Sequence, residues 1–397
     1  MYFFVYSWKH ENMKKALITA LLAGISTCLM GLTWGGVNFL FLIIGLFALI
    51  MLFMMKFENK KLYIYSTWLL SSFLLLITFF PSRFSLAGFI SSLTTLIALV
   101  PFLIGWIDHL IFDRKIIKLK TKLPNFVVSF IIVLIMASIF LLIKQGPEFL
   151  MNKVLDLYVH LIKPFATDRW VITVAESHQP YVRDWFNEFG KNYLWLVIIS
   201  SVFLFYEILK KVSKKDTWKL TAIYAIFIFF FIFTRYSPES VFNGISGLSQ
   251  FLYLGSLILF ISLFVYLYFK TYYKNHSLFE EIKKIDEYLI FVLIWFVIMV
   301  VAARSAIRLV FVFAPITTVI FGYLVDKAYQ ESLKMKKELY KYITIAIIVL
   351  IAASLFIGFY NKTSDQAKYI GPIYNQQWQI AGDWARKNTP ENAVFAH

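Results

Sequence analysis

The sequence has few charged residues and almost no cysteine. Only 16% of its 397 residues are charged, whereas 60% are hydrophobic and 19% are aromatic. Soluble globular proteins are about 25% charged and about 45–50% apolar, so this composition excludes an ordinary soluble protein. The single cysteine, Cys28, excludes an internal disulfide and a cysteine-based metal cluster.

Long apolar runs fill most of the chain. A helix of about 20 apolar residues crosses a bilayer, and in lipid the backbone must satisfy its own hydrogen bonds. The runs are too long and too uniformly apolar for barrel strands. They predict an all-α polytopic membrane protein, a bundle of about 11 or more helices with one long external loop. The predicted spans are 16–34, 37–55, 62–80, 87–112, 126–143, 193–209, 219–233, 250–269, 288–302, 309–325 and 343–360.

Lysine and arginine collect in alternate loops. The basic loops are KHENMKK, KFENKK, DRKIIKLKTK, KKVSKKDTWK, KTYYKNHSLFEEIKK and DKAYQESLKMKKELYK. Because basic loops stay in the cytoplasm, the other connections, including 34–36, 144–192 and 304–308, are predicted outside. The net charge of +16 is then mainly a topology signal with attraction for the lipid bilayer. Scattered basic runs argue against nucleic-acid binding.

The external loop 144–192 is the longest interruption between apolar runs. Its first part has apolar residues at helical spacing, which predicts an amphipathic helix in the membrane interface. These residues are Leu150, Val154, Leu157, Tyr158 and Leu161. A loop of this length with a regular pattern is typically functional.

The stretch TVAESHQPYVRDW (173–185) is unusually polar for this chain. It contains Glu176, His178, Gln179, Arg183 and Asp184. Taken alone, Glu176 and His178 fit a solvated loop, and Asp184 could pair with Arg183 or Lys191. One carboxylate is a poor site for a hard cation, which needs several oxygen ligands. The residues alone therefore predict only a polytopic membrane protein with an ordered external loop.

Five segments resemble the catalytic subunit of oligosaccharyltransferase in its archaeal form. They are LTWGG (32–36), TVAESHQP (173–180) followed by DW, SVFNGISGLSQFLYLG (240–255), ARSAIRLVFVFAP (303–315) and WARKNTPENAVFAH (384–397). TVAESHQP is similar to the family's Ser/Thr-Val-x-Glu motif, and Ile307-Arg308-Leu309 is similar to its Val-Arg-Leu run. The matches follow the family's order and span nearly the whole chain.

The resemblance implies an integral membrane enzyme of GT-C-like architecture, with its active face outside the cytoplasm. The implied reaction is a metal-dependent, inverting transfer of an oligosaccharide from a polyprenyl (dolichyl) phosphate or pyrophosphate. The acceptor is Asn in Asn-x-Ser/Thr of a polypeptide, which becomes N-glycosylated. Glu176 would bind Mg²⁺ or Mn²⁺ and serve catalysis, and Arg308 would bind the lipid phosphate through its forked donors. Arg304 is a second candidate for the phosphate, and His178, Gln179 and Asp184 are candidates on the acceptor loop.

The same resemblance sets expectations for the arrangement of the chain. Arg304 and Arg308 share one face if a single helix runs through both. Residues 1–360 are predicted as the transmembrane domain, and 361–397 as the start of an extracytoplasmic soluble domain, cut before the family's Trp-Trp-Asp-Tyr-Gly motif. The family's acidic sites in its first two external loops have no counterpart here, so we expect a fragment that is inactive alone. The sugar, the number of phosphates and any partner subunits stay open.

Two other classes fit the composition. Another lipid-phosphosugar-dependent glycosyltransferase, such as a protein mannosyltransferase, needs acidic residues in its first external loop but not TVAESHQP. A transporter or membrane scaffold is the less favoured class. Transporters tend to have inverted repeats and helices broken near the midplane, and no internal repeat is visible in this sequence.

Overall fold

The computed structural model describes residues 1–113, 125–148, 151–152, 155, 175–210, 214–274, 276–369 and 375–394. Over these ranges the regular elements are helices, with one isolated antiparallel bridge between Arg235 and Asn243. The α-helices are α1 Tyr2–Lys9, α2 Met13–Thr33, α3 Val37–Phe53, α4 Asn59–Phe79, α5 Leu86–Ser91, α6 Leu93–Asp108, α7 Asn125–Gln145, α10 Val182–Phe189, α11 Lys191–Leu209, α12 Lys214–Phe233, α13 Gly247–Lys274, α14 His276–Lys283, α15 Glu287–Ser305, α16 Val310–Leu333, α17 Glu338–Tyr369 and α18 Gln376–Asn388. Three short pieces are the π-helix η1 His109–Asp113 and the 3₁₀ turns η2 Ala175–Ser177 and η3 Ile307–Leu309.

The prediction of an all-α, multi-pass membrane protein is confirmed. Among the described residues, eight helices are long and apolar enough to cross a bilayer. They are Met13–Thr33, Asn59–Phe79, Leu93–Phe112, Lys191–Leu209, Gly247–Tyr273, Glu287–Ser305, Ile307–Leu333 and Glu338–Tyr369. Three shorter apolar helices, Val37–Phe53, Asn125–Phe140 and Thr217–Phe233, account for the remaining predicted spans.

One predicted span, 87–112, is wrong as a single helix. The chain forms α5 and α6, with Ser92 in extended conformation between them (φ −81°, ψ 125°). The hydroxyl of Thr95 donates to the carbonyl of Phe89 at 2.5 Å, across the break. Hydroxyl side chains offer the backbone such alternatives to helical bonds, and a hydropathy average does not detect them.

The chain divides into two compact units, Met1–Leu324 and Val325–His397. The second unit holds the end of α16, all of α17 and α18. Helix α17 continues to Tyr369, which is beyond the boundary at residue 360 predicted for the transmembrane domain. The predicted amphipathic helix over Leu150–Leu161 lies almost entirely outside the described residues, as do Thr173 and Val174.

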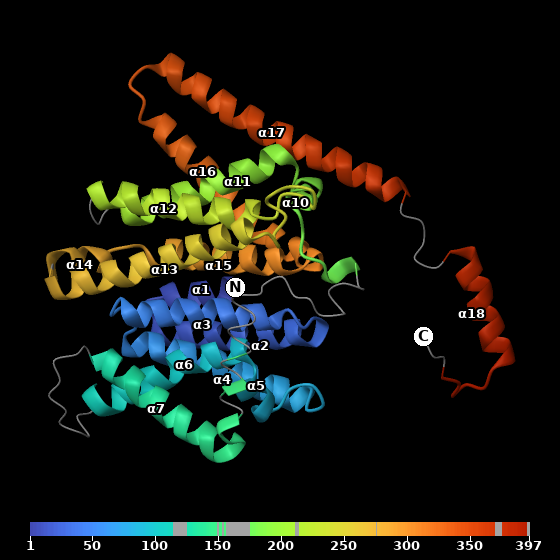
Figure 1. Cartoon of the computed structure of the whole chain (residues 1–397), viewed down its shortest axis with the longest axis horizontal. Helices are drawn as coiled ribbons and strands as arrows, with labels where there is room; N and C mark the ends of the chain where they lie inside the picture. The colour runs from blue at the N-terminus through green and yellow to red at the C-terminus, as the bar shows by residue number, and fades with distance from the viewer. Residues whose placement is uncertain are drawn as a thin grey trace. The chain divides into compact units, whose positions relative to one another are not determined.

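In the first unit, α15 lies between the N-terminal helices and the later ones, and contacts both α3 and α11 (Figure 1). Helix α2 packs along α4, α3 along α6, and α12 along α13. The α3–α6 contact is close, because an ideal Cβ on Gly45 would lie 2.8 Å from the Cα of Ala98. Small residues let membrane helices approach in this way, where dispersion contacts rather than water exclusion hold them together.

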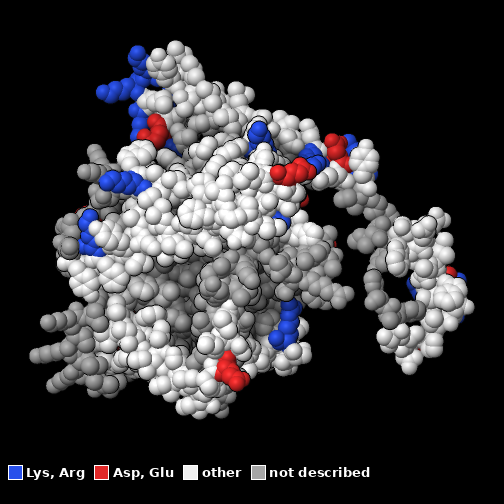
Figure 2. Space-filling view, viewed as in Figure 1, with Lys and Arg blue, Asp and Glu red and all other residues white. Residues whose placement is uncertain are grey.

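Loops that the alternation of basic residues assigns to one side lie together at one end of this unit. Lys60 Nζ donates to the carbonyl of Glu11 at 2.8 Å, and Lys56 Nζ donates to that of Ile285 at 2.6 Å. Lys61 pairs with Glu287 at 2.6 Å. Between the two ends the surface is mostly uncharged on the face seen in Figure 2, as expected of a surface that faces lipid.

Candidate functional site

The loop segment that carries the polar motif is described from residue 175 onward. Glu176 lies in η2 with its side chain exposed, and His178 is exposed as well. Gln179, by contrast, is 5% exposed, and Pro180 is also buried. Exposed and buried residues thus lie within a few positions of each other. The segment packs against the helices at Gln179 and exposes Glu176 at the surface.

Three main-chain hydrogen bonds hold this segment. The carbonyl of His178 accepts from the Ile307 amide at 2.8 Å. The carbonyl of Gln179 accepts from Arg235 Nε at 3.1 Å. The Val182 amide donates to the carbonyl of Arg235 at 3.0 Å. The segment therefore binds both the α12–α13 connection and the α15–α16 turn.

Helix α10 continues the segment and anchors it. Asp184 accepts a hydrogen bond from the Tyr181 amide at 2.7 Å and so satisfies a donor at the start of the helix. Trp185 is fully buried, and its ring meets Phe313 of α16 edge-on at 5.6 Å. Phe189 meets the same ring at 5.6 Å. Asp184 is thus a capping residue, and aromatic packing fixes α10 on α16.

The two candidate arginines have different surroundings. Arg304 is 3% exposed, and its guanidinium donates to the carbonyl of Phe231 and to Gln179 Oε1, both at 3.2 Å. Arg308 lies in η3 and is exposed. Helix α15 ends at Ser305, and Ala306 is extended (φ −158°, ψ 141°). The premise that one helix runs through both arginines is therefore wrong, and they do not share a helical face.

Arg235 joins the loop segment to the connection between α12 and α13. Its guanidinium lies 4.3 Å from the centre of the Tyr181 ring. An ideal Cβ on Gly244 would lie 3.1 Å from Arg235, and Gly244 has φ +84°, so this turn favours glycine. Burial lowers the pKa of Arg235, while Tyr181 and Asp184 act to raise it. Arginine titrates so far above neutral pH that the group stays charged.

The Trp-Gly-Gly turn lies at the same end of the unit. Trp34 lies over Gly36, where an ideal Cβ would come within 1.9 Å of the indole ring. The Trp34 ring is 5.8 Å from that of Phe311, three residues after Arg308. A side chain at position 36 would require the Trp34 ring to move, and the turn contacts the beginning of α16.

The structure thus brings Glu176 and Arg308 into neighbouring turns, because η2 contacts η3. Gln179, Arg304 and Asp184 instead form hydrogen bonds to other groups of the protein. Sequence reasoning missed Arg235. Its only signal was an arginine at the end of an apolar run, a position that is costly unless the charge is bonded.

The described residues do not complete the metal site that the resemblance implies. In the ranges covered by the structure, no three His, Cys, Asp or Glu side chains converge on one point. Glu176 offers one carboxylate, and Mg²⁺ or Mn²⁺ needs several oxygen ligands. The metal therefore does not fit these residues alone.

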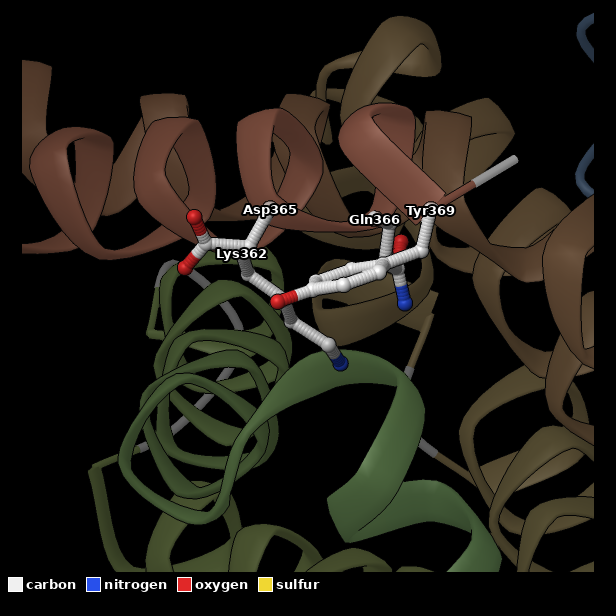
Figure 3. A pocket seen from close by; sticks show the side chains of 4 residues that line it. All are labelled: Lys362, Asp365, Gln366 and Tyr369. Atoms are coloured by element: carbon white, nitrogen blue, oxygen red, sulfur yellow. The ribbon is translucent and has the colours of Figure 1, made fainter. Parts of the chain in front are cut away.

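The second unit has a shallow hollow of its own. Figure 3 shows its lining, Lys362, Asp365, Gln366 and Tyr369, all on α17. Side chains of one helix cannot enclose a ligand, and Asp365 is already paired with Lys368 at 3.1 Å.

A comparison with models of known protein families gives no match, and a comparison with curated proteins gives no match either. The fold itself defines the class as a multi-pass helical membrane protein.

Proposed function

We propose that this chain is the transmembrane part of an oligosaccharyltransferase catalytic subunit. What supports the proposal is that four of the five segments that resemble this family meet at one end of one unit. They are 32–36, 173–180, 240–255 and 303–315. Arg304 donates to Gln179 Oε1, and the Tyr253 ring lies 5.9 Å from the Arg304 guanidinium carbon. The Trp34 ring lies 5.8 Å from that of Phe311. Segments this far apart in a chain need not meet, and their convergence is what a shared site requires.

In the proposed reaction, an oligosaccharide moves from a polyprenyl phosphate or pyrophosphate to the side-chain amide of an acceptor Asn. The bond between the first sugar carbon and the carrier phosphate oxygen breaks, and the phosphate leaves with the electron pair. A bond forms from the same carbon to the amide nitrogen, which loses a proton to the released phosphate or to water. Arg308 is the exposed cation beside Glu176, and its planar donors suit the leaving phosphate oxygens.

Glu176 is the residue that tests the proposal. In full-length protein reconstituted in lipid, Glu176→Ala should lower the turnover number for glycan transfer by about a hundredfold or more. Loss of a group that acts in the transition state lowers kcat rather than raising the Michaelis constant. A side chain that acts directly on the reacting groups contributes about a hundredfold or more to the rate. Glu176→Gln keeps the shape, removes the charge and should be almost as impaired.

The matched control is Glu239→Ala, which removes an exposed carboxylate from another loop on the same predicted side. It should transfer glycan at the normal rate. Normal transfer by Glu176→Ala at saturating donor, acceptor and metal would remove Glu176 from the site. Absence of any transfer by the unsubstituted protein, tested with the acidic external loops and the Trp-Trp-Asp-Tyr-Gly motif that the resemblance implies also present, would reject the proposed function.

A further inference from the structure

Gln179 connects the polar loop segment to two arginines. Its side chain is 5% exposed, and its Oε1 accepts from Arg304 Nη1 at 3.2 Å. Its main-chain oxygen accepts from Arg235 Nε at 3.1 Å. One residue therefore receives hydrogen bonds from two arginines, one at the end of α15 and one in the α12–α13 connection.

The hydrogen bond to Gln179 also matters for Arg304, because the Arg304 guanidinium is buried. A buried guanidinium is tolerated only where its donors are satisfied. The carbonyl of Phe231 in α12 accepts from Nε at 3.2 Å, and the Tyr253 ring of α13 lies 5.9 Å from the guanidinium carbon. The side chain of Arg304 is thus held from three sides, so Gln179 binds to a rigid donor.

Glu176 lies three residues before Gln179. Between them, the His178 carbonyl is bonded to Ile307. With both His178 and Gln179 fixed, little freedom is left for the turn that displays Glu176. Arg308 is one residue beyond Ile307, so the same bonds also set the turn that carries the exposed arginine.

We propose that Gln179 and Arg304 form a clamp that positions Glu176 beside Arg308. Arg304 is then a positioning residue rather than a phosphate ligand, and of these two arginines Arg308 is the one that can face an anionic group. The position of the turn follows from the bonds described here. The consequence for catalysis rests on the proposed function.

The turn can be followed without any enzyme assay. The sequence has one cysteine, so Cys28→Ala gives a background free of reactive thiols. Spin labels on Ser177→Cys and Val301→Cys report the distance from the Glu176 turn to α15. Val301 is 45% exposed and can carry a label, and Glu176 itself stays intact.

We expect a narrow distance distribution for the parent pair in lipid nanodiscs. Gln179→Leu, which keeps the size and removes the amide, should broaden it, and so should Arg304→Met. Gln179→Glu keeps an acceptor for the guanidinium and should restore the narrow distribution. Arg183→Met, at an exposed arginine of the same segment, should change nothing. A narrow distribution in Gln179→Leu would overturn the clamp.

Glycan transfer by the unlabelled full-length variants tests the catalytic consequence. Misplacing a reacting group by about 1 Å can cost about a hundredfold. Gln179→Leu should therefore lower kcat by up to about a hundredfold and leave the Michaelis constant for donor unchanged. Gln179→Glu, which keeps an acceptor, should have a kcat near that of the parent. Unchanged kcat alongside a broadened distribution would show that the clamp does not position a catalytic group. If no variant and no parent protein transfers glycan, the proposed function fails, and the distances still decide the clamp.

Discussion

The carbonyl oxygen of His178 accepts a hydrogen bond of 2.8 Å from the amide of Ile307. This bond joins a turn of the long external loop to the turn between α15 and α16. Glu176 lies two residues before His178 and Arg308 one residue after Ile307, and both are exposed. A carboxylate and a guanidinium are thereby presented on adjacent turns, although the chain separates them widely.

Replacing Ile307 with proline should loosen this junction. Proline has no amide hydrogen, and Ala306 already has the extended backbone that the residue before proline prefers. The His178 carbonyl then loses its partner, at a cost of about 1–3 kcal/mol. Hydrogen exchange at Val182, whose amide bonds to Arg235 in the same junction, should become faster. Ile307→Val keeps the amide and should exchange like the parent, and equal rates in both variants would contradict the role of this bond.

Arg308→Ala should weaken binding of the lipid-linked donor. Loss of a charged hydrogen-bonding partner costs about 1.5–3 kcal/mol, which corresponds to about ten- to a hundredfold in affinity. Titration of donor should show a rise of this size in its apparent Michaelis constant, and titration of acceptor peptide a much smaller one. Arg308→Lys should recover only part of the loss, because an ammonium cannot make the forked contact.

The control for Arg308 is Lys191→Ala, an exposed cation at the start of α11 on the same predicted side. It should leave both constants unchanged. If Arg308→Ala weakens acceptor binding and spares donor binding, the assignment of Arg308 to the phosphate is wrong.

The helices were predictable from sequence because apolar length alone identifies them. The breaks within them were not. Ser92 interrupts a hydrophobic run through local hydroxyl bonds, which an average over the run conceals. Ala306 interrupts the region around the arginines although alanine favours helices. Its extended conformation accompanies the bond from Ile307 to His178, a partner too distant in the chain for any local pattern to reveal.

The candidate site was also only partly predictable from the sequence. Polar composition singled out Glu176 and Gln179, since such residues are rare in this chain, and the family resemblance singled out Arg308. The sequence did not show that Arg304 is buried and Arg308 exposed. A spacing of four residues puts two side chains on one face only where the helix is continuous, and α15 ends at Ser305. Arg235, which binds Gln179, lay outside every motif considered.

Glu287 should contribute strongly to stability at the opposite end of the unit. Its carboxylate accepts from Lys61 Nζ at 2.6 Å and from Trp8 Nε1 at 2.7 Å, and lies 3.3 Å from Lys56 Nζ. The side chain is 16% exposed. Glu287→Ala leaves two half-buried lysines without this partner, and breaking such a pair costs about 3–5 kcal/mol. Thermal unfolding in detergent, followed by tryptophan fluorescence, should shift to clearly lower temperature.

The matched substitution is Glu281→Ala, which breaks an exposed pair with Lys284 at 2.7 Å. Exposed pairs contribute at most about 1 kcal/mol, so its unfolding temperature should stay near that of the parent. Equal shifts for the two variants would show that burial adds nothing to the Glu287 cluster.

The packing of α3 against α6 should tolerate no side chain at Gly45. An added Cβ would lie 2.8 Å from the Cα of Ala98 and 3.0 Å from the carbonyl oxygen of Ile97. Both are backbone atoms, so a side-chain rotation cannot relieve the clash and the helices must separate. Overpacking of this kind costs about 1–3 kcal/mol. Gly45→Ala should therefore lower the unfolding temperature, whereas Gly255→Ala in α13, where nothing lies within 4 Å of the added Cβ, should raise it slightly. The gain at Gly255 comes from about 0.4–1 kcal/mol of reduced freedom in the unfolded chain. If both variants melt at the same temperature, the close approach of α3 and α6 at Gly45 does not exist in the folded protein.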